Sequence, residues 1–186
     1  MLLNDRMQIA APLQGAIVFL TGFMASGKSH FGRQLAELMQ VPFYDLDAFI
    51  ERRQGKSISS LFQSQGEQSF RTIEREALEH IVGEIRSRGP EAMAVVATGG
   101  GAACHADNMN WMNAQGITVW MNPPYEVLMH RLSRETSQRP LVQGLEGEAL
   151  EAFVRSRLSV REPFYRLSNY EIREPNPVPS LWLKKI

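Results

Sequence analysis

The segment from residue 16 to residue 39 limits the possible folds more than any other part of the chain. Residues 16–21 (AIVFLT) form a short apolar run of branched and aromatic side chains, which predicts a buried strand. Gly22 to Ser29 (GFMASGKS) follow with the spacing G-x-x-x-x-G-K-S. Residues 29–39 then carry apolar side chains at helical intervals. A strand, a glycine-rich loop and a helix in this order are typical of a phosphate-binding loop.

The chemistry of such a loop follows from its backbone. Its N–H groups turn inward around a phosphate, and the N-terminus of the next helix adds a partial positive charge. Lys28 is then placed to reach the β- and γ-phosphates of a nucleotide, and the Ser29 hydroxyl is placed to coordinate Mg²⁺. The alternative is a chance match on a glycine-containing turn, which the flanking strand and helix disfavour.

The rest of the chain alternates strand and helix patterns. Further strands are predicted at 41–46, 92–97, 117–121 and 170–173, and helical patterns at 48–54, 57–65, 67–88, 105–115, 122–132 and 148–160. Gly55 and Gly66 are expected to interrupt the helices, and residues 133–147 read as a mobile loop. Apolar strands alternating with helices predict an α/β protein with three layers, α/β/α, around a mostly parallel five-stranded sheet.

Composition limits the partners that this chain can have. Its 186 residues, 44% apolar, can bury a core of their own without a disulfide or a metal, so we expect one domain. We also expect this domain to be a monomer. Its 20 basic and 20 acidic residues balance, which argues against nucleic acid and against a polybasic membrane surface. The single cysteine, Cys104, and the absence of a long apolar run predict a cytoplasmic protein without a membrane span. Residues 1–15 read as an irregular lead-in without a signal-peptide pattern.

Two aspartates follow the predicted strand at 41–46. If Asp45 and Asp47 are both extended, their side chains point the same way, at the sheet edge where ligands of open α/β sheets bind. A carboxylate near a metal and a carboxylate near a substrate could then share one cleft. The alternative is an aspartate that only caps the next helix, which is common.

Other candidates are weaker on physical grounds alone. Arg71 and Glu74 are i,i+3 neighbours in a helical stretch, where an exposed ion pair is the usual explanation and a carboxylate clamp the functional one. The triple glycine 99–101 follows a buried strand and allows close approach of a ligand, or else forms a flexible turn. Arg139 and Arg161 would be read as surface residues if nothing else were considered.

Six segments closely resemble, in this order, those of the shikimate kinase family over residues 16–165: GFMASGKS, DLD, FRTIE, TGGG, RPLV and REPFY. Many nucleotide-binding proteins share the first segment, whereas FRTIE followed by a triple glycine and Arg-Pro-Leu is far more specific. That family uses ATP and Mg²⁺ to phosphorylate the 3-hydroxyl of shikimate, in the pathway to aromatic amino acids. The resemblance implies a P-loop kinase core with a substrate-binding lobe at about 48–75 and a mobile lid at about 133–147.

The resemblance also implies roles at the nucleotide end. Lys28 and Ser29 would hold the triphosphate and Mg²⁺, with Asp45 supporting the metal through water. Asp47 would meet the attacking hydroxyl, and Arg139 would close with the lid onto the phosphates. The implied catalytic residues are Lys28, Asp47 and Arg139, the metal residues Ser29 and Asp45, and the ATP-contacting residues Ala25, Ser26, Gly27, Lys28, Ser29, His30 and Arg139.

At the shikimate end the resemblance implies a carboxylate site. Arg71 and Arg161 would bind the shikimate carboxylate, and Glu74 would orient Arg71 or touch the ring. Gly100 would supply a backbone contact. The implied substrate-binding residues are Asp47, Arg71, Glu74, Gly99, Gly100, Gly101 and Arg161.

Three features depart from the family pattern. Ala25 stands where a glycine is usual, and its methyl group is compatible with the loop if the φ angle is negative. Leu46 separates the two aspartates where Thr or Ser is frequent. Residues 169–180 (NYEIREPNPVPS) are proline-rich and lack the usual adenine-binding pattern, so we assign no adenine contact to them.

Two other functions stay open at this point. One is another small-molecule kinase of the same fold, such as a gluconate kinase, because two arginines fit any carboxylated polyol. The other is a catalytically silent ATP-binding module that regulates a partner. The presence of all the reactive residues argues against the second.

Overall fold

The computed structural model describes residues 13–135, 142 and 144–186. Five strands form one sheet in the order β2-β3-β1-β4-β5, and all four neighbouring pairs are parallel. The strands are β1 (Ile17–Thr21), β2 (Phe43–Asp45), β3 (Ala94–Ala97), β4 (Ile117–Met121) and β5 (Tyr170–Ile172). The helices are α1 (Lys28–Met39), α2 (Leu46–Gln54), α3 (Ile58–Arg86), the 3₁₀ turn η2 (Ala102–Cys104), α4 (Asn108–Gln115), α5 (Tyr125–Glu135), α6 (Gly147–Tyr165) and α7 (Pro179–Leu183).

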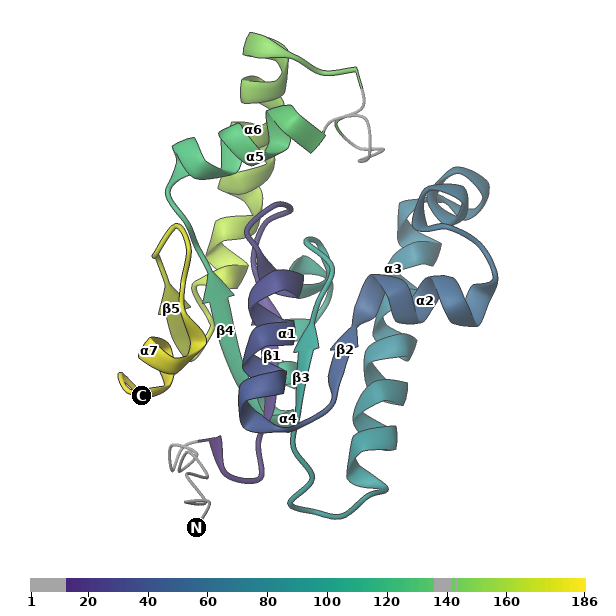
Figure 1. Ribbon diagram of the computed structural model, residues 1–186. Helices are drawn as coiled ribbons and strands as arrows, with labels where there is room; N and C mark the ends of the chain where they lie inside the picture. The colour runs from purple at the N-terminus through teal and green to yellow at the C-terminus, as the bar shows by residue number, and fades with distance from the viewer. Residues whose placement is uncertain (1–12, 136–141, 143) are drawn as a thin grey trace.

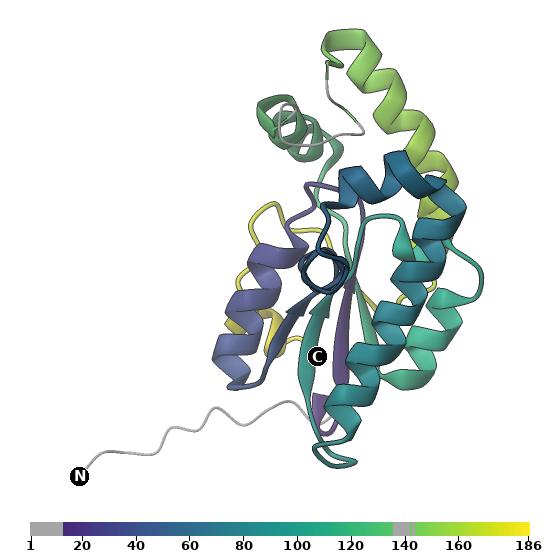
Figure 2. The same ribbon diagram turned by 90° about the vertical axis from the view of Figure 1, so that its right-hand side faces the viewer.

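Both faces of the sheet are buried because the central strands are apolar at nearly every position. Ile17 and Phe19 of β1 point into a core formed with α3, α4 and α6, while Val18 and Leu20 point into a second core formed with α1 and α7. Figures 1 and 2 show α1 on one side of the sheet and α3 and α4 on the other. The expected three-layer α/β fold with a parallel sheet is confirmed.

The predicted helix breaks are confirmed. Gly55 ends α2 in the left-handed region (φ 63°), and Gly66 lies inside α3 with non-helical angles (φ 77°, ψ 171°). The first part of α3 therefore turns away from its second part, which packs against the sheet. Together with α2, this first part extends beside the sheet edge formed by β2 (Figure 1).

Three boundaries differ from the expectation. Strand β2 ends at Asp45, and α2 begins at Leu46, so the strand is shorter than the predicted 41–46. Helix α6 continues through Pro163 to Tyr165 instead of ending at 160. The proline-rich tail also contains a helix, α7, with Pro179 in its first turn, where a missing N–H group costs no hydrogen bond.

None of the helices in the described part of the chain combines the length and hydropathy that a membrane span needs.

Candidate active site

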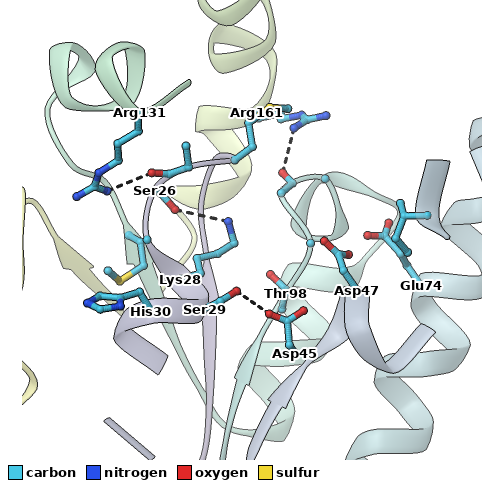
Figure 3. Close-up of a pocket in the computed structure, with 18 of the residues that line it drawn as sticks. Ser26, Lys28, Ser29, His30, Asp45, Asp47, Glu74, Thr98, Arg131 and Arg161 are labelled. Atoms are coloured by element: carbon cyan, nitrogen blue, oxygen red, sulfur yellow. Dashed lines mark hydrogen bonds between the residues drawn. The ribbon is translucent and has the colours of Figure 1, made fainter. Parts of the chain in front are cut away.

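The carboxyl ends of β1, β2 and β3 open into a cleft of about 1080 Å³. This is where ligands of open α/β sheets bind, because the loops that follow parallel strands meet there. The cleft is lined by the glycine-rich loop, by Asp45 and Asp47, by the first part of α3, by the triple glycine and by residues from α5, α6 and the C-terminal tail. Figure 3 shows the labelled side chains that converge on it.

The glycine-rich loop is closed by Lys28. Its Nζ atom donates hydrogen bonds to the carbonyl oxygens of Gly22 and Phe23, both at 2.9 Å, and lies 3.5 Å from the Ser26 hydroxyl. The Ser26 N–H also donates to the Phe23 carbonyl, at 3.2 Å. These contacts hold the turn in front of the N-terminus of α1, where an anion is stabilised by the helix dipole.

The condition under which the Ala25 methyl group would fit the loop is not met. The φ angle of Ala25 is 60°, in the left-handed region, so the methyl group is strained where a glycine would not be. The carbonyl of Ala25 accepts a hydrogen bond from Arg131 Nη1 at 3.1 Å, which holds this conformation in place. Local sequence does not reveal this angle, and the hydrogen bond that accompanies it comes from a residue 106 positions later.

Ala25→Gly is therefore expected to raise the free energy of unfolding. Relief of left-handed strain, about 1–2 kcal/mol, exceeds the entropy that glycine adds to the unfolded chain, about 0.4–1 kcal/mol. Chemical denaturation should show a gain of about 0.5–1 kcal/mol. The same change at the exposed helical Ala114 should instead cost about 1 kcal/mol. A loss of stability at both positions would contradict the strain at Ala25.

Asp45 has the geometry of a helix cap and of a metal residue at once. Its Oδ1 atom accepts the Ala48 N–H at 3.2 Å and so caps α2, while its Oδ2 atom accepts the Ser29 hydroxyl at 2.6 Å. Ser29 and Asp45 thus place two hard oxygen donors side by side next to the loop, a donor set that fits Mg²⁺. Among the described residues no group of three or more His, Cys, Asp or Glu side chains could hold a metal by itself.

Asp47 reaches the same cleft by a different route from the expected one. It lies in the first turn of α2 rather than on an extended strand, so the strand-based argument for its direction is wrong. Asp47 is exposed in the cleft, but the protein atoms packed around its carboxyl remove part of its hydration, and this desolvation raises its pKa. The neighbouring Asp45 raises the pKa further, while Lys28 opposes the shift.

Arg71 and Glu74 are buried, not an exposed surface pair. They are 7% and 1% exposed, and Arg71 Nη1 donates to Glu74 while Nη2 donates to Glu67 at 3.0 Å. The guanidinium also lies over the rings of Phe62 and Phe70. Burial raises the pKa of Glu74 to about 7, although the adjacent Arg71 opposes the shift. This pair on α3 faces the cleft, as a carboxylate clamp requires.

The triple glycine lacks side chains because other side chains occupy the space. A Cβ atom on Gly99 would lie 2.6 Å from Glu74 Oε1 and 2.9 Å from Asp47 Oδ1, and one on Gly101 would collide with the Arg71 guanidinium. Figure 3 shows the Asp47 and Glu74 carboxylates near this turn. The glycines therefore bring α2 and α3 within contact distance of the end of β3.

Of the two remaining predicted arginines, the structure describes Arg161 but not Arg139. Arg161 lies within α6, is 6% exposed, and its Nη1 atom donates to the Gly100 carbonyl at 3.2 Å. The sequence predicts that Arg161 follows the helix, but α6 continues past Pro163 to the fully buried Tyr165. Arg139 lies outside the described residues, as does much of the expected lid at 133–147. His30 lines the cleft at the start of α1.

Sequence reasoning missed the residues that close the cleft beside the glycine-rich loop. Arg131 Nη2 donates to the Pro175 carbonyl at 2.6 Å and lies 3.2 Å from Asn176 Oδ1, so it links the glycine-rich loop to the tail. Pro175, Asn176 and Pro177 all line the cleft. The proline-rich tail, for which the sequence suggests no nucleotide contact, therefore forms part of the site wall. No local pattern marks Arg131, since its partners are distant in sequence.

Comparison with known proteins agrees with this geometry. The model of the family described as "Shikimate kinase" matches residues 24–179. This chain belongs to the shikimate kinase family. A shikimate kinase of Bacteroides fragilis is 43% identical over 153 residues, which are 82% of each chain. The crystal structure of shikimate kinase from Bacteroides thetaiotaomicron superposes with a TM-score of 0.80 at 37% identity, covering 91% of this chain and 93% of that one.

A second solved member of the shikimate kinase family was determined in complex with shikimate. That protein, from Acinetobacter baumannii, is 34% identical, with a TM-score of 0.77, and the match covers 91% of this chain and 89% of that one. The family resemblance that the motifs indicated is therefore confirmed. The other small-molecule kinases and the silent binding module are not favoured by these matches.

Proposed function

We propose that this protein transfers the γ-phosphoryl group of ATP to the 3-hydroxyl of shikimate, giving shikimate 3-phosphate and ADP. The observation that carries the proposal is that one cleft holds a phosphate-binding loop, a buried arginine pair and Asp47, whose carboxyl feels the charges of both Lys28 and Arg71. Membership in the shikimate kinase family supports the choice of substrate over other carboxylated polyols.

At the nucleotide end, the loop amides and Lys28 bind the β- and γ-phosphates, with further contacts from Ala25, Ser26, Gly27, Ser29 and His30. Ser29 and Asp45 would hold Mg²⁺, which would neutralise charge on the phosphates. Arg131 and the segment 175–177 form the wall against which the rest of the nucleotide lies. The contact between Ser29 and Asp45 and the position of this wall support these roles.

At the acceptor end, Arg71 and Arg161 bind the shikimate carboxylate, since paired guanidinium groups suit a planar anion. Glu74 holds Arg71 in place, and the backbone of Gly99, Gly100 and Gly101 contacts the ring hydroxyls. Asp47 interacts electrostatically with Lys28 at the loop and with Arg71 in this group, so a hydroxyl beside it would face the γ-phosphate. The burial of Arg71, Glu74 and Arg161 supports a site that is organised before substrate binds.

The reaction needs little early deprotonation of the acceptor hydroxyl, because phosphoryl transfer passes through a loose transition state. Asp47 aligns the hydroxyl and accepts its proton late, and its raised pKa suits this role. Lys28 stabilises charge on the transferring group, and Arg139 of the expected lid adds a further positive charge. We infer that the enzyme works as a cytoplasmic monomer in the pathway to aromatic amino acids.

The direct test is ADP release with candidate acceptors. Shikimate should support turnover with ATP and Mg²⁺, whereas gluconate at the same concentration should not. Release of ADP with gluconate but not with shikimate would favour the other kinase, and no release with either would favour a silent binding module.

Arg71→Lys should lower kcat/KM for shikimate by about 2–3 kcal/mol, roughly 30- to 150-fold. Lysine keeps the charge but cannot serve Glu67, Glu74 and a substrate carboxylate from one planar fork. A neutral shikimate analogue should lose little further in the variant, because the interaction is already absent. The matched control is Arg88→Lys, in an exposed pair with Glu84, where we expect no more than about 0.5 kcal/mol. Equal sensitivity of the variant and the wild type to loss of the carboxylate would show that Arg71 does not bind it.

A further inference from the structure

Tyr165 at the end of α6 is the largest fully buried side chain among the described residues, and none of the roles above uses it. Its hydroxyl donates a hydrogen bond to the carbonyl oxygen of Gly100 at 2.5 Å. The same carbonyl accepts Arg161 Nη1 at 3.2 Å. One backbone oxygen of the triple glycine thus receives two donors from one helix, and one of these donors is a proposed substrate ligand.

Packing alone does not explain the hydroxyl. The ring of Tyr165 lies 5.9 Å from that of Trp120, and a phenylalanine would make the same ring contact. A buried hydroxyl is costly unless it is paired, so its presence at a fully buried position needs a partner that makes use of it. Burial raises the pKa of the Tyr165 hydroxyl above its ordinary value, which keeps the group protonated as a donor.

The position of Gly100 explains why such an anchor matters. A Cβ atom built on Gly100 would lie 3.1 Å from the Met24 backbone nitrogen and 3.7 Å from Arg161 Nη1. Gly100 therefore lies between the phosphate-binding loop and α6. A small rotation of its peptide would shift the triple-glycine turn against the loop, and it would also move the Gly100 carbonyl oxygen that accepts the hydrogen bond from Arg161. The Tyr165 hydroxyl and the Arg161 guanidinium together fix this oxygen from one side, the side of α6.

We propose that Tyr165 is a positioning residue for the acceptor substrate. Its hydroxyl fixes the Gly100 carbonyl, and through that oxygen it sets the direction of the Arg161 guanidinium and of the Gly100 peptide in the shikimate site. The inference rests on the proposed function, since it takes Arg161 as a ligand of the substrate carboxylate. Tyr165 itself touches neither substrate, but it determines the geometry of Arg161, which binds the substrate carboxylate.

The test is Tyr165→Phe, assayed by steady-state kinetics with each substrate varied in turn. Loss of the hydroxyl should raise KM for shikimate about tenfold, because a guanidinium without its fixed acceptor loses preorganisation. KM for ATP should stay within about twofold, since the phosphate-binding loop keeps its own contacts. The shikimate-induced rise in Tm should shrink in parallel, and this measurement applies even if the variant is less stable than the wild type.

Tyr125→Phe is the matched control. The Tyr125 hydroxyl is also buried, but it has no hydrogen-bond partner among the described residues, and its ring lies beside Arg155 outside the cleft. Its removal should leave both KM values within about twofold of the wild type. A shikimate defect of equal size in both variants would show that loss of any buried hydroxyl is enough, and would overturn the inference.

A double variant separates this inference from the proposed function. If Tyr165 acts through Arg161, Tyr165→Phe should cause less than about twofold further loss when Arg161 is already lysine. Full additivity would overturn the inference, as would a lower Tm with an unchanged KM for shikimate. If Arg161→Lys itself leaves shikimate binding unchanged, the proposed carboxylate site is wrong. If Arg161→Lys weakens binding and Tyr165→Phe does not, only the role of Tyr165 is wrong.

Discussion

Lys28→Met should leave a folded protein whose turnover is at least about a thousandfold lower, a loss of on the order of 4 kcal/mol in transition-state stabilisation. The variant removes the positive charge next to the γ-phosphate and also the two hydrogen bonds to the carbonyls of Gly22 and Phe23. Methionine has a similar length and tolerates the partly apolar surroundings, so the fold should survive. Single-turnover kinetics with saturating ATP and shikimate would measure the effect.

The matched control for this prediction is Lys184→Met, which removes a charge at the exposed end of α7. It should keep kcat within about twofold of the wild type. Circular dichroism and thermal unfolding of both variants separate catalysis from folding. Turnover of Lys28→Met above about a tenth of the wild-type value would contradict the phosphate-binding role of the loop.

Asp47→Asn should lower kcat about a hundredfold or more, with a much smaller effect on ATP binding. Asparagine keeps the shape and can still hydrogen-bond the acceptor hydroxyl, but it cannot take up the proton. The raised pKa of Asp47 fits this role, because burial and the nearby Asp45 make its carboxylate a better proton acceptor than an ordinary aspartate. Steady-state assays and ATP titration would supply the two numbers.

Asp107→Asn is a suitable control, since Asp107 precedes α4 and forms no side-chain cap. It should change kcat by no more than about twofold. If Asp47→Asn instead abolishes ATP binding while kcat at saturation persists, Asp47 would be the metal residue. The roles proposed for Asp45 and Asp47 would then be exchanged.

The features that sequence predicts best are those whose cause is local. The strand, loop and helix around Lys28 follow from consecutive residues, because the amides that bind a phosphate all lie in one turn. The five strands follow from short apolar runs, and the breaks at Gly55 and Gly66 follow from the positive φ that glycine permits. The six motifs, taken in their order along the chain, are specific enough to indicate the family.

The environment of the charged groups cannot be predicted in this way. An i,i+3 pair such as Arg71 and Glu74 looks the same in sequence whether it lies in solvent or in a core. Only the packing of α3 against the end of β3 decides that the pair is buried, and that burial raises the pKa of Glu74 to about 7. Sequence does not reveal the position of Asp47 either. Strand β2 ends at Asp45, so Asp47 reaches the cleft from the first turn of α2 instead of from a strand.

By itself, then, the sequence determined the elements, the α/β class and the phosphate-binding loop, because periodicity and turn chemistry act over a few residues. Tertiary structure decided the left-handed angle of Ala25, the cleft wall that Arg131 builds with the tail, and the hydrogen bond from Tyr165 to Gly100. Each of these depends on a hydrogen bond between residues 44 to 106 positions apart. Such contacts form only when the sheet brings its loops to one edge, and no local pattern records them.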